Sequence, residues 1–354
     1  MRRYGAALLC GLLSLLLVSA CTMGTGTGIG GDGEKKREKQ DASSKPIFNN
    51  RGTGVVSILE KQAKDALSIT IASGGQSGVY YAVGDALGKL YEQALGVTAS
   101  VQATASSVEN IHLLAQGHAQ LALIGSDAAV RAYEGAAPFT KKMDRFQAIA
   151  ALYPNYVQLV TTSDTGIGQV SDLAGKKVAV GALNSVVEQN AREVLAAFGL
   201  AYDDFEAEFL PYAEAVDGLK NGTVDAAFVI SGLPNSEIVD SLLTEDIYVV
   251  PLTGSAMIEL QKEHPYYIQG FIPAHTYRNE SDVPTVAIMN VLVASRELDE
   301  ETVYQLTKTF FSKMAVIQNA HVVTRNLTMT GAKDFLPIPL HPGAERFYKE
   351  RGMK

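Results

Sequence analysis

Hydrophobic positions along the chain alternate between the spacing of β-strands and the spacing of α-helices. The β-branched run Ser68–Ala72 predicts a strand, and a helical pattern follows it and stops at Gly96. Alternating residues at 97–103 predict the next strand, and a helix is expected to begin near Ser107. The apolar residues that recur at helical spacing before Gly96 are Val79, Val83, Leu87, Leu90 and Ala94.

The same alternation continues to the C-terminus. Further strands are predicted at 121–124, 157–162, 178–180, 224–230 and 285–294. A long helix is expected at 298–320, and a last one from Pro342 onward. Strands that alternate with helices predict an α/β fold, in which mostly parallel sheets are flanked by helices and joined by right-handed crossovers.

The length of 354 residues suits two lobes better than one hydrophobic core. We expect lobe I to comprise residues 67–152 and 286–354, and lobe II to comprise residues 153–285. The chain then crosses between the lobes near 151–157 and again near 282–287. Ligands of open α/β sheets bind beyond the carboxyl ends of the strands, which places the expected site in the cleft between the lobes.

The N-terminus has the composition of an export signal. Two arginines precede an apolar run at 6–18 that is too short to cross a membrane comfortably. The letters LVSAC at 17–21 resemble a bacterial lipobox, a signal whose cysteine is acylated and becomes the mature N-terminus. We therefore expect residues 1–20 to be a lipoprotein signal peptide and Cys21 to anchor the protein to a bilayer, outside the cytoplasm. The alternative is a chance cysteine after a plain secretory signal.

Residues 21–66 are expected to form a flexible tether. They begin with a Gly/Thr-rich stretch and continue with a charged run at 34–39, a composition that buries too little apolar surface to order itself. The letters GIGGDG at 28–33 match the pattern GxGxxG. No strand is predicted before them and no helix after them, which argues against a nucleotide site.

Charge and composition narrow the function further. The formal charge of −8 argues against nucleic acid as a partner. Both cysteines, Cys10 and Cys21, lie near the N-terminus, and the six histidines lack the spacing of a metal site. No disulfide, thiol nucleophile, cofactor or transition metal is therefore expected. The chain has no GxSxG motif and no P-loop, and an enzyme that uses ordinary carboxylates is the alternative to a binding protein.

Strands in both predicted lobes end in Ser- and Gly-rich turns that open into helices. The first turns of helices carry free N–H groups and a partial positive charge, which suit anions. Each serine either binds a ligand or only caps its helix, and five such turns divided between two lobes favour a shared cleft. The candidate residues in these turns are Gly74, Gly75, Gln76, Ser77, Ser106, Ser107, Asn110, Ser126, Ser185 and Ser231.

Larger side chains near these turns have two interpretations each. Tyr80 and Tyr81 begin a helix near the expected cleft, where a tyrosine either contacts ligand or packs in the core. Tyr153 lies where the chain leaves lobe I, so it lines either the hinge or the cleft. Asp127 either pairs with a ligand ammonium or caps its helix. Arg192 either clamps a carboxylate or forms an ion pair at the protein surface or between the lobes.

Five segments of the chain are similar to the motifs of one known family. The letters SGGQSGVYY at 73–81 are similar to its TGGxGGxYY opening, and those at 107–110, 151–154 and 225–228 to its SVEN, ALYP and DAAF segments. The letters PIPLHPGAER at 337–346 are similar to its PIPLHPGAERYY ending. On these five segments the chain resembles the TAXI family, whose members are the substrate-binding proteins of tripartite ATP-independent periplasmic (TRAP) transporters.

The resemblance implies a type II-like periplasmic-binding-protein fold with a hinge between the lobes, and no catalysis. It also implies glutamate or a related amino or dicarboxylic acid as the solute, and the TRAP membrane subunits as the protein partner. The family's GSGTE turn reads NSVVE at 184–188, where two valines narrow the turn, and Ser77 stands where glycine is usual. The alternatives are a binding protein of the same fold that serves an ABC transporter, or a sensor.

The N-terminal pattern predicts lipidation at Cys21. Mass spectrometry of the native protein should show diacylglycerol on this cysteine. Two or three acyl chains would anchor the protein firmly, because each buried methylene contributes about 0.8 kcal/mol to membrane binding. A free thiol at Cys21, or cleavage at another position, would contradict the prediction.

Overall fold

The computed structural model describes residues 67–76 and 78–353. The expected signal peptide (1–20), the lipidation site Cys21, the tether (21–66) and the candidate Ser77 lie outside these described residues.

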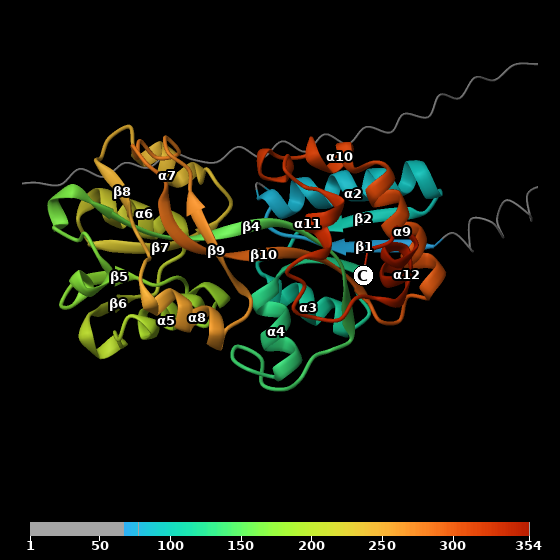
Figure 1. The fold of residues 1–354 in the computed structure, drawn as a ribbon, viewed down its shortest axis with the longest axis horizontal. Coiled ribbons are helices and arrows are strands. Elements are labelled where there is room, and N and C mark those ends of the chain that lie inside the picture. The colour runs from blue at the N-terminus through green and yellow to red at the C-terminus, as the bar shows by residue number, and fades with distance from the viewer. Residues whose placement is uncertain (1–66, 77, 354) are drawn as a thin grey trace, which may run out of the picture. The chain divides into compact units, whose positions relative to one another are not determined.

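The first part of the chain forms three parallel strands in the order β2-β1-β3. A helix follows each strand, as the sequence pattern predicts. The strands are β1 (Ser68–Ala72), β2 (Thr98–Gln102) and β3 (Leu121–Gly125), and the helices are α2 (Val79–Leu95), α3 (Ser107–Ala115) and α4 (Ser126–Glu134). The C-terminal helices α9 (Glu300–Ser312), α10 (Met314–Gln318), α11 (Met329–Lys333) and α12 (Pro342–Glu350) belong to the same half, which we call lobe I (Figure 1).

The middle of the chain forms the other half, lobe II, around the strand order β7-β5-β6. These three strands are also parallel. They are β5 (Lys177–Ala179), β6 (Glu206–Glu208) and β7 (Ala226–Ser231), with helices α5 (Val186–Ala197), α6 (Tyr212–Asn221), α7 (Ser236–Ser241) and α8 (Ser255–Glu263). The strands β8 (Ile247–Val250) and β9 (Tyr267–Ile272) pair with the two long strands described next.

Two long neighbouring strands run through both lobes (Figure 1). Strand β4 (Phe146–Thr162) pairs with β7 of lobe II, and β10 (Val283–Ser295) pairs with β3 of lobe I. The two strands also pair with each other, and all these pairs are antiparallel. The chain therefore passes from lobe I to lobe II along β4 and returns along β10.

The pairing of β4 with β10 is irregular between the lobes. Met289 lies opposite Pro154, whereas Val291 lies opposite Ala151, so the register shifts at Asn290. The side-chain Nδ2 of Asn290 donates a hydrogen bond to the carbonyl oxygen of Tyr153 at 2.9 Å, inside this bulge. Bulges bend strands and increase their twist, and this one lies where a hinge between the lobes is required.

Each lobe has its own hydrophobic core on both faces of its sheet. Alternate residues of a strand point to opposite faces, so Leu123 of β3 joins one apolar cluster and Ile124 joins another. In lobe II, the neighbouring residues Phe228 and Val229 of β7 likewise point to opposite faces of the sheet and join two different apolar clusters. Neither lobe depends on the other to bury its strands, which allows their relative position to change.

Several elements differ from the sequence-based expectation. The strand expected at 157–162 is the end of the longer β4, because the alanine-rich stretch before it also extends through the sheet. The helix expected at 298–320 is divided into α9 and α10 by Lys313, whose backbone leaves the helical region (φ −123°, ψ 26°). The short or weakly patterned elements β6, β8, β9, α6, α7, α8 and α11 had no clear signal in the sequence.

Candidate functional site

A cavity of about 390 Å³ lies between the two lobes, at the carboxyl ends of their parallel strands. Its walls include Ser73 and Gly74 after β1, Gly125 at the end of β3, Gly181 after β5 and Ile230 in β7. Ligands of open α/β sheets bind at this edge. The volume lies at the small end of the range for ligand pockets, so the cavity suits a small solute.

Several helices begin at the cavity, and α3, α4 and α5 present their N-terminal turns to it. Ser106 caps α3, since its Oγ accepts a hydrogen bond from the N–H of Glu109 at 3.2 Å. Ser185 caps α5 in the same way, with the N–H of Glu188 at 3.1 Å. Helix α4 begins directly after β3. Each capping hydroxyl accepts a bond and still has its own proton to donate, so capping does not prevent it from binding a ligand.

The structure brings together part of the residue set expected from the sequence. Those that line the cavity are Gly74, Tyr80, Ser106, Ser107, Asp127 and Ser185. Those that do not line it are Gly75, Gln76, Tyr81, Asn110, Ser126, Tyr153 and Ser231. The residues that line the cavity thus come from both lobes. The other expected residues have different contacts, which are described below for four of them.

Asn110 holds the ends of lobe I strands in place instead of facing the cavity. Its Nδ2 donates to the carbonyl oxygens of Ser73 at 2.6 Å and Leu123 at 2.8 Å, and its Oδ1 accepts from Thr104 at 2.6 Å. The side chain is completely buried. Both N–H bonds of this amide and its carbonyl oxygen are engaged, so Asn110 acts on the site through the backbone that it fixes.

Three other expected residues are also buried or engaged elsewhere. Tyr153 packs in the lobe I core, and burial raises the pKa of its phenol. Ser126 is buried at the start of α4. The Oγ of Ser231 accepts hydrogen bonds from Gln158 at 3.0 Å and Asn235 at 3.2 Å inside lobe II. The sequence places all three at the right turns, but their side chains do not reach the cavity wall.

Four polar cavity residues were not among the candidates predicted from the sequence. Ser73 follows β1, Asn155 lies in β4, Asn190 in α5 and Tyr212 at the start of α6. The Tyr212 hydroxyl donates to the carbonyl oxygen of Ile230 at 2.8 Å, and burial raises its pKa. Asn190 follows Val186 of the Ser185 turn by four residues, on the same face of α5, and that spacing was the available signal for it.

Tyr80 links the cavity to the strands that join the lobes. Its hydroxyl donates to Oδ1 of Asn290 at 2.5 Å, and Nδ2 of Asn155 donates to the same oxygen at 3.2 Å. Burial is the main reason that the pKa of Tyr80 is raised, so the phenol stays protonated and acts as a donor. The bulge at Asn290 and the cavity wall are therefore held by one set of hydrogen bonds.

Asp127 lies in the first turn of α4 and is only 4 % exposed. Its Oδ2 accepts a hydrogen bond from Nδ2 of Asn190 in lobe II at 2.5 Å. Burial raises the pKa of Asp127, while the hydrogen bond from Asn190 and the nearby charge of Arg131 oppose this shift. Asp127 thus lines the cavity and contacts the other lobe at once.

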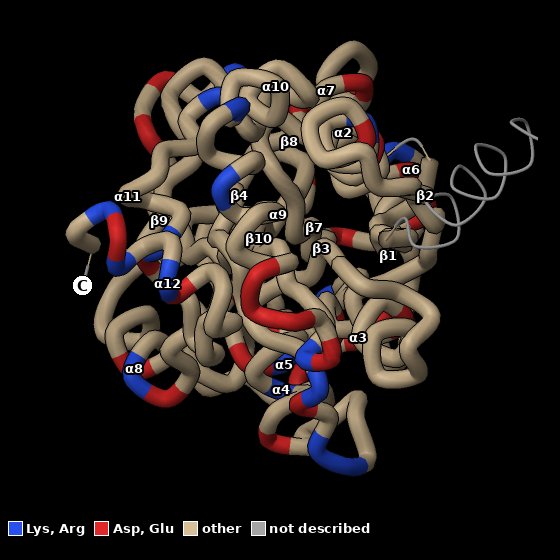
Figure 2. The backbone as a smooth tube through the Cα atoms, turned by 90° about the vertical axis from the view of Figure 1, so that its right-hand side faces the viewer, with Lys and Arg blue, Asp and Glu red and all other residues tan. Residues whose placement is uncertain are grey.

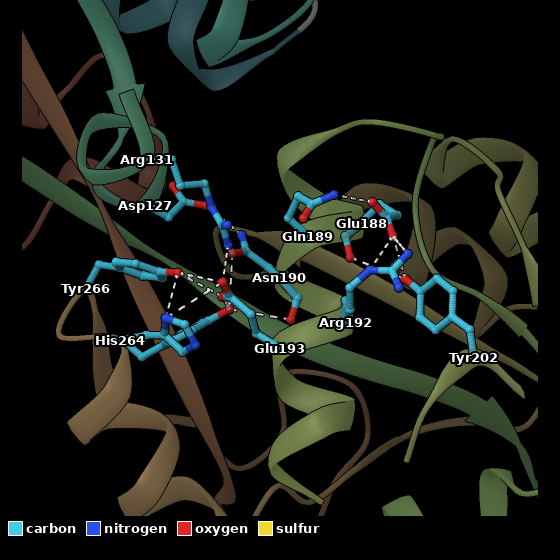
Figure 3. Close-up of polar contacts among 11 residues, drawn as sticks. Asp127, Arg131, Glu188, Gln189, Asn190, Arg192, Glu193, Tyr202, His264 and Tyr266 are labelled. Carbon is cyan, nitrogen blue, oxygen red and sulfur yellow. Dashed lines mark hydrogen bonds and ion pairs between the residues drawn. The ribbon is translucent and has the colours of Figure 1, made fainter. Parts of the chain in front are cut away.

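Beyond Asp127, a buried polar cluster joins α4 to lobe II (Figure 3). Nη2 of Arg131 lies 2.5 Å from Oε1 of Glu193, with side chains 8 % and 15 % exposed. The hydroxyls of Tyr266 and Tyr267 donate to the same carboxylate at 2.8–2.9 Å. We call Asp127, Arg131, Asn190, Glu193, Tyr266 and Tyr267 the interlobe cluster. It holds the lobes together at the cavity's edge.

Arg192 forms an ion pair within its own helix. Its Nη2 lies 2.7 Å from Oε1 of Glu188, and its guanidinium lies 3.9 Å from the centre of the Tyr202 ring. Arg192 does not line the cavity. Of its two interpretations, the ion pair describes what the structure shows (Figure 3).

The part of the chain that the structure describes has no cluster of His, Cys, Asp or Glu suited to a metal ion. None of its helices is long and apolar enough to cross a membrane. Charged residues of both signs are interspersed over the view in Figure 2.

Residues 71–352 match the model of the NMT1-like family. The chain belongs to the NMT1-like family. This match spans both lobes and every cavity residue named above.

This NMT1-like protein is similar to several solved structures. PhnD1 from Prochlorococcus marinus, in complex with methylphosphonate, is 11% identical, with a TM-score of 0.51 over 81% of this chain and 99% of that chain. A TctC solute-binding protein from Polaromonas is 14% identical, with a TM-score of 0.49 over 72% and 88% of the two chains. The periplasmic aliphatic sulphonate binding protein SsuA from Escherichia coli is 15% identical, with a TM-score of 0.45 over 81% and 88%. The two-lobed α/β fold expected from the sequence is confirmed by the first of these.

The interlobe cluster predicts that Arg131→Met destabilises this NMT1-like protein. The change leaves the buried carboxylate of Glu193 without its cation, so we expect the free energy of unfolding to fall by about 3 kcal/mol. Arg145 is the matched control, because it pairs with Glu297 with both side chains 61% exposed. Arg145→Met should cost less than about 1 kcal/mol. Equal, small losses for both variants in chemical denaturation would contradict a role for the cluster.

Proposed function

We propose that this protein is an extracytoplasmic solute receptor that captures a small carboxylate between its two lobes. The observation that supports this most is the cavity at which α3, α4 and α5 begin, with walls from both lobes. Glutamate or a related amino or dicarboxylic acid is the proposed solute. No catalytic step is assigned.

Free N–H groups and hydroxyls supply the anion's hydrogen bonds in this proposal. The cavity wall contains no Lys, Arg or His among the described residues. A carboxylate at the start of α5 would receive a hydrogen bond from the Ser185 hydroxyl, bonds from the following N–H groups, and the favourable field of the helix. Gly74 of lobe I and Ser106 at the start of α3 would hold the other end of the solute.

A carboxylate fits this wall better than a phosphonate does. PhnD1 is similar in fold and was solved with methylphosphonate, so phosphonates are the natural competitors. A phosphonate near neutral pH carries more negative charge than a carboxylate and would lie in the same small cavity as Asp127. Because the wall has no basic side chain among the described residues, little would offset the repulsion between the phosphonate and the carboxylate of Asp127.

We infer that the receptor belongs to the TAXI class and delivers its solute to TRAP membrane subunits. The support is the set of five sequence segments described above, which span 73–346. A lipid anchor at Cys21 would hold the protein at a bacterial membrane, with residues 21–66 as the tether between anchor and lobes. The same fold serving an ABC transporter or a sensor is the competing assignment.

Ser185→Ala tests solute capture directly. Loss of a hydrogen bond to a charged group costs about 1.5–3 kcal/mol, so affinity for the bound carboxylate should fall by about ten- to a hundredfold. Loss of the helix cap should also lower stability by about 1 kcal/mol. Calorimetric titration with amino and dicarboxylic acids, beside a melting curve, measures both.

Thr328→Ala is the matched control for Ser185→Ala. Thr328 caps α11 by accepting from the N–H of Gly331 at 3.0 Å, and it does not line the cavity. It should lose stability and keep full affinity. If Ser185→Ala behaves in the same way as this control, Ser185 only caps its helix and the proposed carboxylate site is wrong.

The assignment to a TRAP transporter predicts that loss of the membrane subunits affects solute uptake but not solute binding. Deletion of the TRAP membrane subunits should abolish uptake of the solute in cells, while the purified receptor binds it with unchanged affinity. Uptake that continues at the normal rate in that deletion strain, but stops when an ABC permease is removed, would assign the receptor to an ABC transporter instead.

A further inference from the structure

The two carboxylates of the interlobe cluster, Asp127 and Glu193, do not share its cations equally. Both basic side chains at the cluster lie against Glu193: Arg131, and His264, whose Nδ1 lies 3.7 Å from Oε1 of Glu193. Arg131 is committed to Glu193, since Nη2 lies 2.5 Å from Oε1. No ion pair joins Arg131 to Asp127 within the described residues, although the charge of Arg131 acts to lower the pKa of Asp127. One buried negative charge is therefore left without a contacting cation.

That carboxylate faces the cavity. Asp127 is 4 % exposed and belongs to the cavity wall, where no Lys, Arg or His of the described chain accompanies it. Its partner Asn190 supplies one hydrogen bond, which stabilises the carboxylate but does not neutralise it. A buried carboxylate without a cation is unfavourable, and either a proton or a cation from outside relieves it.

Most of the remaining side chains of the lobe II wall are apolar, although Asn155, Ser185 and Tyr212 also line it. The apolar side chains are Val186, Val187, Leu210, Pro211 and Ile230, and Ile288 of β10 adds to them. Val187 is fixed closely against the turn before it, because a Cβ on Gly181 would lie 2.8 Å from its Cγ1. A second carboxylate on the solute would have no cation on this wall, whereas an apolar side chain would be buried favourably.

We propose that the solute is an α-amino acid with an apolar side chain, whose ammonium group pairs with Asp127. The proposal rests on the proposed capture of a small carboxylate, and within that class it favours apolar amino acids over glutamate and dicarboxylic acids. The carboxylate of the amino acid lies at the helix starts, the ammonium lies against Asp127, and the side chain lies against the valines of α5. Asp127 is then the residue that distinguishes amino acids from acids without an amine.

The test compares solutes that differ by one group. L-leucine, its 2-oxo acid 4-methyl-2-oxopentanoate, L-glutamate and succinate are titrated into the protein by calorimetry. Leucine should bind about ten- to a hundredfold more tightly than the 2-oxo acid, since only leucine offers a charged donor to Asp127. It should also bind more tightly than glutamate, because the described residues of the wall include no cation for a second carboxylate.

Asp127→Asn assigns this preference to the residue. The variant should bind leucine and the 2-oxo acid with similar affinity, whereas Asp299→Asn, which changes an N-cap outside the cavity, should keep the wild-type preference. A melting curve confirms that both variants are folded. If Asp127→Asn does not fold, the ratio of leucine to 2-oxo acid affinity in the wild-type protein decides the question.

The possible failures are distinct. Equal binding of leucine and its 2-oxo acid by the wild-type protein would overturn the ammonium pairing and leave solute capture standing. Tighter binding of glutamate or succinate than of leucine would overturn the apolar side chain. If none of the four compounds binds, both this inference and the proposed carboxylate receptor fail.

Discussion

The rest of the structure depends on two neighbouring antiparallel strands, β4 and β10, which carry the chain from one lobe to the other and back. Each lobe buries its own strands between its own helices, and the lobes contact each other around the cavity and through the interlobe cluster. The register shift at Asn290 interrupts the strand pair between them. We infer that a local change of backbone there would move one lobe relative to the other, as hinges do in two-lobed proteins.

Hydrogen bonds connect this hinge to the cavity and the cavity to the interlobe contact. Tyr80 reaches from the cavity wall to Asn290 of the bulge. On the other side, Asn190 lines the cavity and bonds both Asp127 and Arg131. A solute that occupies the cavity touches groups at both ends of this chain of contacts. It shifts the equilibrium between open and closed lobes only by the difference in its affinity for the two arrangements.

Features of the site that depend on neighbouring residues in the sequence could be predicted, whereas those that depend on the packing of distant segments could not. The caps at Ser106 and Ser185 follow from a serine three residues before a glutamate, a pattern that depends on one helical turn. Which side of a helix faces a cavity depends on packing that no local pattern contains. Asn110 was therefore expected in the site but fixes strand ends, whereas Asn190 was overlooked. Tyr212 could not be found because α6 itself had no clear signal.

The central claim is that the lobes close on a small solute held between them. Small-angle X-ray scattering of the purified protein, with and without saturating amino acid, tests it most directly. The account predicts a smaller radius of gyration with solute, because contacts from both lobes favour the closed arrangement. A radius that stays unchanged at a concentration where calorimetry shows full binding would contradict it.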